Sequence, residues 1–152
     1  MKTVEGRDTP LNVLLVEDSP GDVRLTQEAF RNINPSVQLH VVTDGVEAMA
    51  FLRHEAPFQQ SPRPDLTLLD LNLPKMDGRE VLALIKGDPD LKTIPTVILT
   101  SSDAEADITR SYQLQANSYL TKPLQLEDFE TLVKRINDFW LVSSRRPHPE
   151  TA

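Results

Sequence analysis

The segment LTLLDLNLPKMDG spans residues 66–78, and its first part is an almost wholly apolar, β-rich run that ends in Asp70. Such a run is typical of a strand that is buried on both faces, and such strands occur in parallel sheets that helices cover on both sides. The segment therefore predicts a central strand of an α/β protein, with a carboxylate at the C-terminal end of that strand.

The rest of the chain repeats this pattern. Four more β-rich apolar runs occur, at residues 13–16, 37–42, 96–100 and, more weakly, 118–121. Between them, Ser19 and Pro20 predict the N-cap and first residue of a helix, and Ser102 with Glu105 predicts a capping box. Apolar residues at helical spacing predict a last helix over residues 126–140 that packs on the sheet. Together these patterns predict a doubly wound, five-stranded parallel sheet.

Length and composition limit the possible functions. The 152 residues, 39% of them hydrophobic, suit one domain over residues 11–142, with a flexible segment over 1–10 and a polar tail over 143–152. The net charge of -7, without a dense basic stripe, argues against direct binding to nucleic acid. The chain has no cysteine and no apolar stretch long enough for a signal peptide or a membrane span. We therefore expect a cytoplasmic protein without disulfides, thiol chemistry or membrane contact.

Polar residues follow four of the predicted strands. They are Glu17 and Asp18 after the first strand, Asp70 after the third, Thr100 at the end of the fourth, and Lys122 after the fifth. Ligands of open α/β sheets bind outside the carboxyl ends of the strands, so these side chains should meet in one cup.

The chemistry of this cup favours a metal ion and a phosphoryl group. Three crowded carboxylates repel one another unless a divalent cation and the Lys122 ammonium neutralise them. Oxygen ligands without Cys or a nearby His favour a hard ion, so Mg²⁺ is the expected cofactor, with Mn²⁺ as a mimic. Asp70 is the best candidate for a nucleophile that forms an aspartyl phosphate, and Thr100 would donate its hydroxyl to a phosphoryl oxygen.

These motifs resemble those of the receiver domains of bacterial response regulators, over roughly residues 11–140. The resemblance rests on four stretches: the strand that ends in Glu17 and Asp18, residues 68–78 around Asp70, ILTS at 98–101, and YLTKP at 119–123. The chain is similar, more narrowly, to single-domain regulators paired with cyanobacterial phytochromes. This narrower resemblance rests on the connection over residues 57–64, the sequence around Asp70 and the Phe139–Trp140 end.

The resemblance implies a flavodoxin-like receiver fold with strand order 2-1-3-4-5, and it implies a role for each motif residue. These roles are Asp70 as phosphoacceptor; Asp18, Asp70 and the main-chain carbonyl of Asn72 as metal ligands; Glu17 as a ligand directly or through water; Lys122 as phosphate partner; Thr100 as switch hydroxyl; and Tyr119 as switch aromatic. A cis bond between Lys122 and Pro123 is implied as well. The phosphoryl donor would be a sensor histidine kinase, a phytochrome in the narrower resemblance. The protein would be a signalling phosphoacceptor whose only chemistry is its own phosphorylation and dephosphorylation, not an enzyme.

The route by which the signal leaves also follows from the chain. Too few residues follow Trp140 for an output domain, so we expect a contact with a downstream protein that the sequence does not identify. In the predicted fourth helix, Ala104, Ile108 and Tyr112 form a narrow apolar stripe, which would anchor this helix weakly and leave it adjustable. We expect phosphorylation to change the face formed by helix four, strand five and helix five, and we expect a homodimer on that face.

Two other classes of protein share parts of this pattern. A flavodoxin-like flavin carrier has the same sheet order, but the three acids in EDSPGD at residues 17–22 would repel a flavin phosphate. A phosphatase of the haloacid dehalogenase class also uses Asp, Thr or Ser, Lys and Mg²⁺. That class carries its nucleophile on the first strand, with a second Asp two residues later, whereas Asn72 occupies that place here.

Overall fold

The structure is a computed structural model that describes residues 11–102, 104–123 and 125–143. The five strands are β1 (Leu11–Val16), β2 (Val37–Val42), β3 (Leu66–Leu69), β4 (Thr96–Thr100) and β5 (Ser118–Thr121). The five α-helices are α1 (Pro20–Ile33), α2 (Gly45–Arg53), α3 (Gly78–Gly87), α4 (Glu105–Gln113) and α5 (Leu126–Ile136). A 3-10 turn, η1 (Leu91–Thr93), precedes β4, and a π-helical segment, η2 (Asn137–Ser143), follows α5. The predicted segment 1–10 and nearly all of the predicted tail 143–152 lie outside the described residues.

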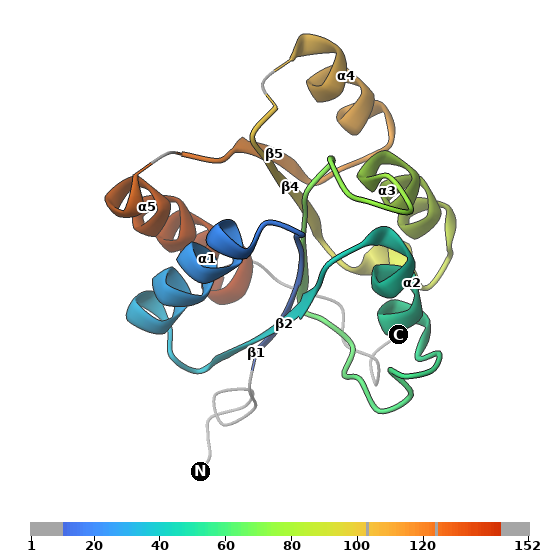
Figure 1. Ribbon diagram of the computed structural model, residues 1–152, viewed down its shortest axis with the longest axis horizontal. Helices are drawn as coiled ribbons and strands as arrows, with labels where there is room; N and C mark the ends of the chain where they lie inside the picture. The colour runs from blue at the N-terminus through green and yellow to red at the C-terminus, as the bar shows by residue number, and fades with distance from the viewer. Residues whose placement is uncertain (1–10, 103, 124, 144–152) are drawn as a thin grey trace.

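The strands form one parallel sheet in the order β2-β1-β3-β4-β5, which confirms the predicted fold. Helices α1 and α5 lie on one side of the sheet, and α2 and α3 lie on the other (Figure 1). The three inner strands are built from residues that are almost all fully buried, because both of their faces are covered.

Each face of the sheet has its own apolar core. On one face, residues of β1, β3 and β4 pack against α1 and α5, and the largest buried side chain there is Phe129. On the other face the cluster joins α2, α3 and η1 to the same strands, with Tyr119 of β5 packed at its margin. The sheet is therefore fixed from both sides, and its carboxyl edge is a rigid place on which to build a site.

Two predicted helix ends have different outcomes. Helix α1 begins as predicted: Pro20 is its first residue, and the Ser19 side chain accepts a hydrogen bond from the Asp22 amide at 3.3 Å. The capping box at Ser102 and Glu105 is wrong. Helix α4 begins at Glu105 with Ala104 as its N-cap, and because alanine has no polar side chain, this helix start has no side-chain cap. The Ser102 hydroxyl lies before the helix, where it donates to Asp107 and accepts the Ala104 amide.

The last helix also differs from its prediction. The α-helix ends at Ile136, and the chain continues as the π-helical η2 rather than as one α-helix to Trp140. A π-helix has more residues per turn, so the apolar stripe moves out of phase, and Phe139 is 59% exposed. Leu126 at the start of α5 is also exposed. No helix in the described part of the chain is both long and apolar enough to cross a membrane.

Candidate functional site

The registers of the strands bring the polar residues together. Val16 of β1 lies beside Leu69 of β3, so the next residues of the two strands leave the sheet at the same level. The Asp70 amide donates to the Val16 carbonyl at 3.1 Å, and this hydrogen bond extends the ladder by one residue. Thr100 of β4 lies beside Thr121 of β5, and the Lys122 amide donates to the Thr100 carbonyl at 2.8 Å. Strand ends far apart in the sequence therefore open onto one edge.

Three carboxylates meet at this edge. Glu17, Asp18 and Asp70 each offer a carboxylate oxygen, and these oxygens lie within 4.8 Å of one another. Glu17 and Asp70 are 2% and 5% exposed, whereas Asp18 is exposed. The set consists of hard oxygen donors and opens to solvent at Asp18, which fits a cation that keeps part of its water, such as Mg²⁺.

Lys122 is the cationic partner of this cluster. Its ammonium lies 2.6 Å from Glu17 Oε1, 2.8 Å from Asp22 Oδ2 and 3.0 Å from Asp70 Oδ2. The Lys122 side chain is 6% exposed, so its ion pairs with the buried Glu17 and Asp70 are shielded from water, whereas the Asp22 side chain is 32% exposed. The cis bond expected between Lys122 and Pro123 is wrong for this structure, whose described residues have their cis bond at Ala56–Pro57.

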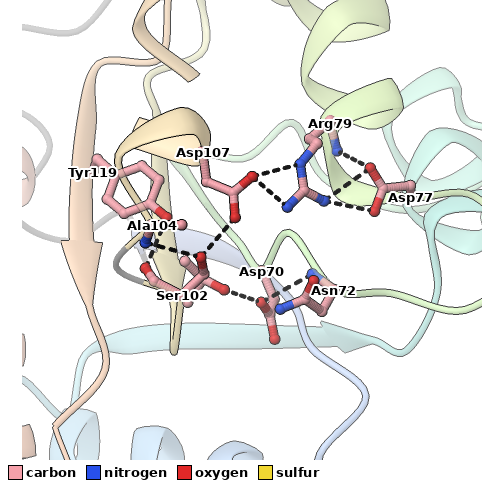
Figure 2. Close-up of polar contacts among 9 residues, drawn as sticks. Asp70, Asn72, Asp77, Arg79, Ser102, Ala104, Asp107 and Tyr119 are labelled. Atoms are coloured by element: carbon pink, nitrogen blue, oxygen red, sulfur yellow. Dashed lines mark hydrogen bonds and ion pairs between the residues drawn. The ribbon is translucent and has the colours of Figure 1, made fainter. Parts of the chain in front are cut away.

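Asp70 is held on both of its carboxylate oxygens. Oδ1 accepts the Thr100 hydroxyl at 2.7 Å and the Asn72 amide at 3.2 Å, and the latter contact is drawn in Figure 2. Oδ2 accepts the Lys122 ammonium. These contacts fix the plane of the carboxylate at the edge of the sheet.

Burial and hydrogen bonding shift the pKa values of the two buried acids, Glu17 and Asp70, in opposite directions. Burial raises the pKa of Glu17 to about 7, although its bond to Lys122 acts in the opposite direction. Burial also acts to raise the pKa of Asp70. The Thr100 hydroxyl and the Lys122 ammonium outweigh it, so the pKa of Asp70 lies below its usual value. Asp70 is therefore ionised throughout the neutral range, while Glu17 exchanges a proton within it.

The three carboxylates also shift the pKa of Lys122. Burial acts to lower the pKa of Lys122, but its bonds to the carboxylates outweigh burial and raise this pKa above its usual value. The ammonium is therefore charged at any physiological pH, and it compensates part of the negative charge of the cluster.

Gly78, the first residue of α3, lies directly against the phosphoacceptor candidate. A Cβ atom at Gly78 would collide with the Asp70 carbonyl oxygen, and it would lie 2.6 Å from the Leu71 Cα atom. The Gly78 amide donates to the Leu71 carbonyl at 2.9 Å. Only glycine allows the start of α3 to close on the backbone of Asp70 in this way.

The remaining predicted site residues lie close to this cluster. Tyr119 is half-buried on β5, and its hydroxyl donates to the Ser102 carbonyl at 2.8 Å, so the ring lies beside the β4–α4 loop (Figure 2). Asn72 lies two residues after Asp70 in the loop, and its own amide donates to Asp70 Oδ1. Its carbonyl therefore belongs to a residue that is held next to Asp70. The predicted residues therefore share one edge of the sheet.

Sequence reasoning missed Asp22, the third anion on Lys122, and it missed Arg79, which joins two acids next to the site. Asp22 lies in the first turn of α1, three residues after the Ser19 N-cap. The predicted helix start next to Glu17 and Asp18 could therefore have indicated that Asp22 lies near the cup. The partners of Arg79 gave no comparable signal.

Comparison with known proteins agrees with this geometry. Residues 13–136 match the family model of the response regulator receiver domain. The chain is 51% identical over 138 residues to the response regulator Rcp1 of Synechocystis sp., which covers 91% of this chain and 94% of Rcp1. It is 41% identical to FilR2 of Methanothrix harundinacea, a probable methanogenesis regulatory protein, over 93% of this chain and 91% of that one.

Solved structures show the same likeness. The phosphorylated cyanobacterial phytochrome response regulator RcpA is 49% identical, with a TM-score of 0.88 over 92% of this chain and 100% of that chain. The Mn²⁺-bound form of Rcp1 is 50% identical, with a TM-score of 0.86 over 91% of this chain and 100% of that chain. Neither a flavin carrier nor a haloacid dehalogenase phosphatase is supported. The fold, the edge at which the carboxylates meet and these matches together place the chain in the response regulator receiver family.

Proposed function

We propose that Asp70 accepts a phosphoryl group from a sensor histidine kinase, in a Mg²⁺-dependent reaction in the cytoplasm. The observation that carries this proposal is the setting of Asp70: a buried, ionised carboxylate bonded to both Thr100 and Lys122, within 4.8 Å of two further acids. The protein acts as a signalling phosphoacceptor and turns over no substrate other than its own phosphoryl group.

The transfer needs little from the protein beyond positioning and charge. A carboxylate oxygen of Asp70 attacks the phosphorus of a phosphohistidine. The phosphorus–nitrogen bond breaks, and its electron pair returns to the imidazole, which takes up a proton. Lys122 is charged and lies 3.0 Å from Asp70, so it can hold an oxygen of the incoming group, and the Thr100 hydroxyl can donate to another.

The metal ligands that we propose are Asp18, Asp70 and the main-chain carbonyl of Asn72, with Glu17 acting directly or through water. The carboxylate oxygens of the three acids already lie close together, and the Mn²⁺-bound form of the similar protein Rcp1 supports the use of a divalent cation. When bound, the cation neutralises charge on the phosphoryl oxygens.

The signal leaves through the face formed by α4, β5 and α5. Thr100 would be drawn towards the phosphoryl group, and Tyr119 would leave the Ser102 carbonyl and turn inward, which changes the surface of α4 and β5. A downstream protein reads this change. We propose a phytochrome as the kinase, and the similarity to RcpA, a cyanobacterial phytochrome response regulator, supports this.

The same face supplies a surface for a homodimer. A shallow apolar hollow of about 280 Å³ lies at its α5 end, lined by Ser118, Leu120, Arg135, Ile136, Phe139 and Trp140. Phe139 is 59% exposed, although it is large and apolar. A second copy would cover this ring. Sedimentation of the wild type and of Phe139→Glu tests the dimer, and a wild type that stays monomeric both with and without phosphorylation contradicts it.

The phosphoacceptor is tested with a small acyl phosphate and Mg²⁺, with intact mass as the readout. One phosphoryl group should add to the wild type, none to Asp70→Asn, and one to Asp65→Asn, a control at the opposite end of β3. A chelator should prevent the addition. Labelling that persists in Asp70→Asn contradicts the phosphoacceptor, and labelling that survives the chelator contradicts the metal.

A further inference from the structure

A network of four polar side chains joins α3 to α4 beside the site, and it takes no part in the proposed transfer chemistry. Its members are Asp77, Arg79, Ser102 and Asp107, and we call it the α3–α4 latch (Figure 2). Arg79 lies at its centre, with the guanidinium between two carboxylates.

The contacts of the latch are short and involve several atoms of each group. Arg79 Nη1 lies 2.9 Å from Asp77 Oδ1, and Arg79 Nη2 lies 2.7 Å from Asp107 Oδ1. Arg79 Nε also donates to Asp107 Oδ1 at 3.1 Å, and the Ser102 hydroxyl donates to Asp107 Oδ2 at 2.6 Å. Both oxygens of Asp107 are thus occupied. The side chains of Arg79 and Asp107 are 30% and 22% exposed, so water screens these charges only in part.

The latch matters because α4 has few other attachments. Among its described residues Ser111 alone is buried, and its N-cap, Ala104, offers no side-chain bond. Ile108 is half-buried, and Tyr112 near the end of the helix is exposed, although its hydroxyl accepts the Tyr119 amide at 3.1 Å. The first turn of α4 is therefore attached to the rest of the molecule largely through Asp107, by polar contacts that can be exchanged for water at little cost.

Both ends of the latch reach the surroundings of Asp70. On the α3 side, Arg79 follows Gly78, which packs against the Asp70 carbonyl. On the α4 side, Ser102 comes two residues after Thr100, whose hydroxyl binds Asp70. The Ser102 carbonyl also accepts the Tyr119 hydroxyl at 2.8 Å. A shift of the Thr100 hydroxyl from Asp70 to a phosphoryl oxygen would therefore reach Ser102, and through it Asp107 and Tyr119.

We propose that Arg79 and Asp107 hold α4, and with it the contact between Tyr119 and Ser102, in the arrangement of the unphosphorylated protein, and that phosphorylation opens this latch. The second half of this inference rests on the proposed function, whereas the first half concerns the unphosphorylated protein alone. Because coupling is reciprocal, a group that favours the unphosphorylated arrangement must also disfavour phosphorylation.

Amide hydrogen exchange in α4 tests the first half. Arg79→Gln and Asp107→Asn should each raise the exchange of residues 105–113 about three- to tenfold in the unphosphorylated protein, and the double variant should add little to either. Arg63→Gln is the matched control, because it breaks a comparable Arg–Asp pair, 3.0 Å to Asp90, away from α4. Exchange in α4 that rises no more in the two latch variants than in Arg63→Gln overturns the latch.

Phosphorylation tests the second half. At a limiting concentration of acyl phosphate with Mg²⁺, Arg79→Gln and Asp107→Asn should reach about a two- to fivefold higher ratio of phosphorylated to unphosphorylated protein than the wild type, while Arg63→Gln matches the wild type. An unchanged ratio beside faster exchange shows a structural tie and overturns the role in switching. Failure of the proposed function is distinct from this, because then the wild type takes up no phosphoryl group at Asp70 while the exchange experiment still decides the latch.

Discussion

Helix α4 follows strand β4 and helix α5 follows strand β5, but different kinds of contact hold the two helices on the sheet. α5 buries Phe129, Leu132, Val133 and Ile136 in the core that it shares with α1. α4 buries only Ser111 among its described residues and depends on polar contacts, those of Asp107 in its first turn and of the Tyr112 hydroxyl near its end. Water cannot replace an apolar contact, whereas it can replace a hydrogen bond at small net cost. One helix is therefore fixed by apolar packing, and the other is held by contacts that water can replace.

The largest expected effect is on the fixed helix. Phe129 is fully buried, so Phe129→Ala should lower the free energy of unfolding by about 3–5 kcal/mol, through lost burial and a cavity. Ile108→Ala on α4, where the side chain is half-buried, should cost less than about 1.5 kcal/mol. Urea unfolding measures both. Equal losses from the two substitutions would show that α4 is packed as firmly as α5, contrary to the comparison.

The second effect concerns metal binding at the carboxylate cluster of Glu17, Asp18 and Asp70. Burial raises the pKa of Glu17 to about 7, and a metal ion must displace that proton. Mg²⁺ affinity should therefore fall with falling pH below about 7, by up to about tenfold per unit, and level off above it. Titration calorimetry at several pH values measures this. Glu17→Gln should flatten the dependence in this range, and a wild-type affinity that does not change between pH 5.5 and 7.5 would remove Glu17 from the site.

The same pKa has a consequence for the metal-free protein. Glu17 binds its proton more tightly in the folded protein, where its pKa is about 7, than in the unfolded chain, where its pKa has the ordinary value of 4.5. Its contribution to stability is thus fully present below pH 4.5 and is lost as the pH rises through about 7. A divalent cation bound to the deprotonated cluster would offset this loss, so the stabilisation by Mg²⁺ should grow over the same interval.

Salt separates the two helices in a third way. Added salt of about 0.5 M shortens the screening length to a few ångströms, which weakens partly exposed ion pairs such as Arg79–Asp107. Amide exchange in α4 should then rise about twofold, while exchange in α5 stays the same or slows. Arg79→Gln should lose this salt response. A salt response of equal size in both helices would assign it to the whole fold instead of the latch.

Local signals predicted the strands and layers of the fold well, whereas the strand order followed from the family resemblance. The apolar strand runs have a length and composition typical of a covered parallel sheet, and Ser19 with Pro20 marks a helix start through contacts within one turn. The strand ends then place Glu17, Asp70, Thr100 and Lys122 at one edge, since parallel strands share their polarity. Such inferences do not require knowledge of how side chains pack.

The misses have the opposite character. The Ser102–Glu105 pair has the spacing of a capping box, but the helix has its N-cap two residues after Ser102, at Ala104, and the Ser102 hydroxyl donates to Asp107. Arg79 and Asp107 lie 28 residues apart, and nothing in either helix alone indicates that they meet. Asp22 could be placed near the cup, yet its bond to Lys122 spans 100 residues. Contacts of this kind depend on how helices pack on the sheet.

The smallest expected effect completes the contrast between the two helices. Ser111 is the buried residue of α4, and within the described residues its hydroxyl has no hydrogen-bond partner. Removing an unsatisfied polar group costs little, and alanine favours a helix more than serine does, so Ser111→Ala should change the free energy of unfolding by no more than about 0.5 kcal/mol. Thr26→Val in α1 is the matched control. There the buried hydroxyl donates to the Asp22 carbonyl at 2.8 Å, and its loss should cost about 1 kcal/mol. If urea unfolding shows that Ser111→Ala costs as much as Thr26→Val, the Ser111 hydroxyl makes a bond that holds α4, and the helix is less free to move than its other contacts indicate.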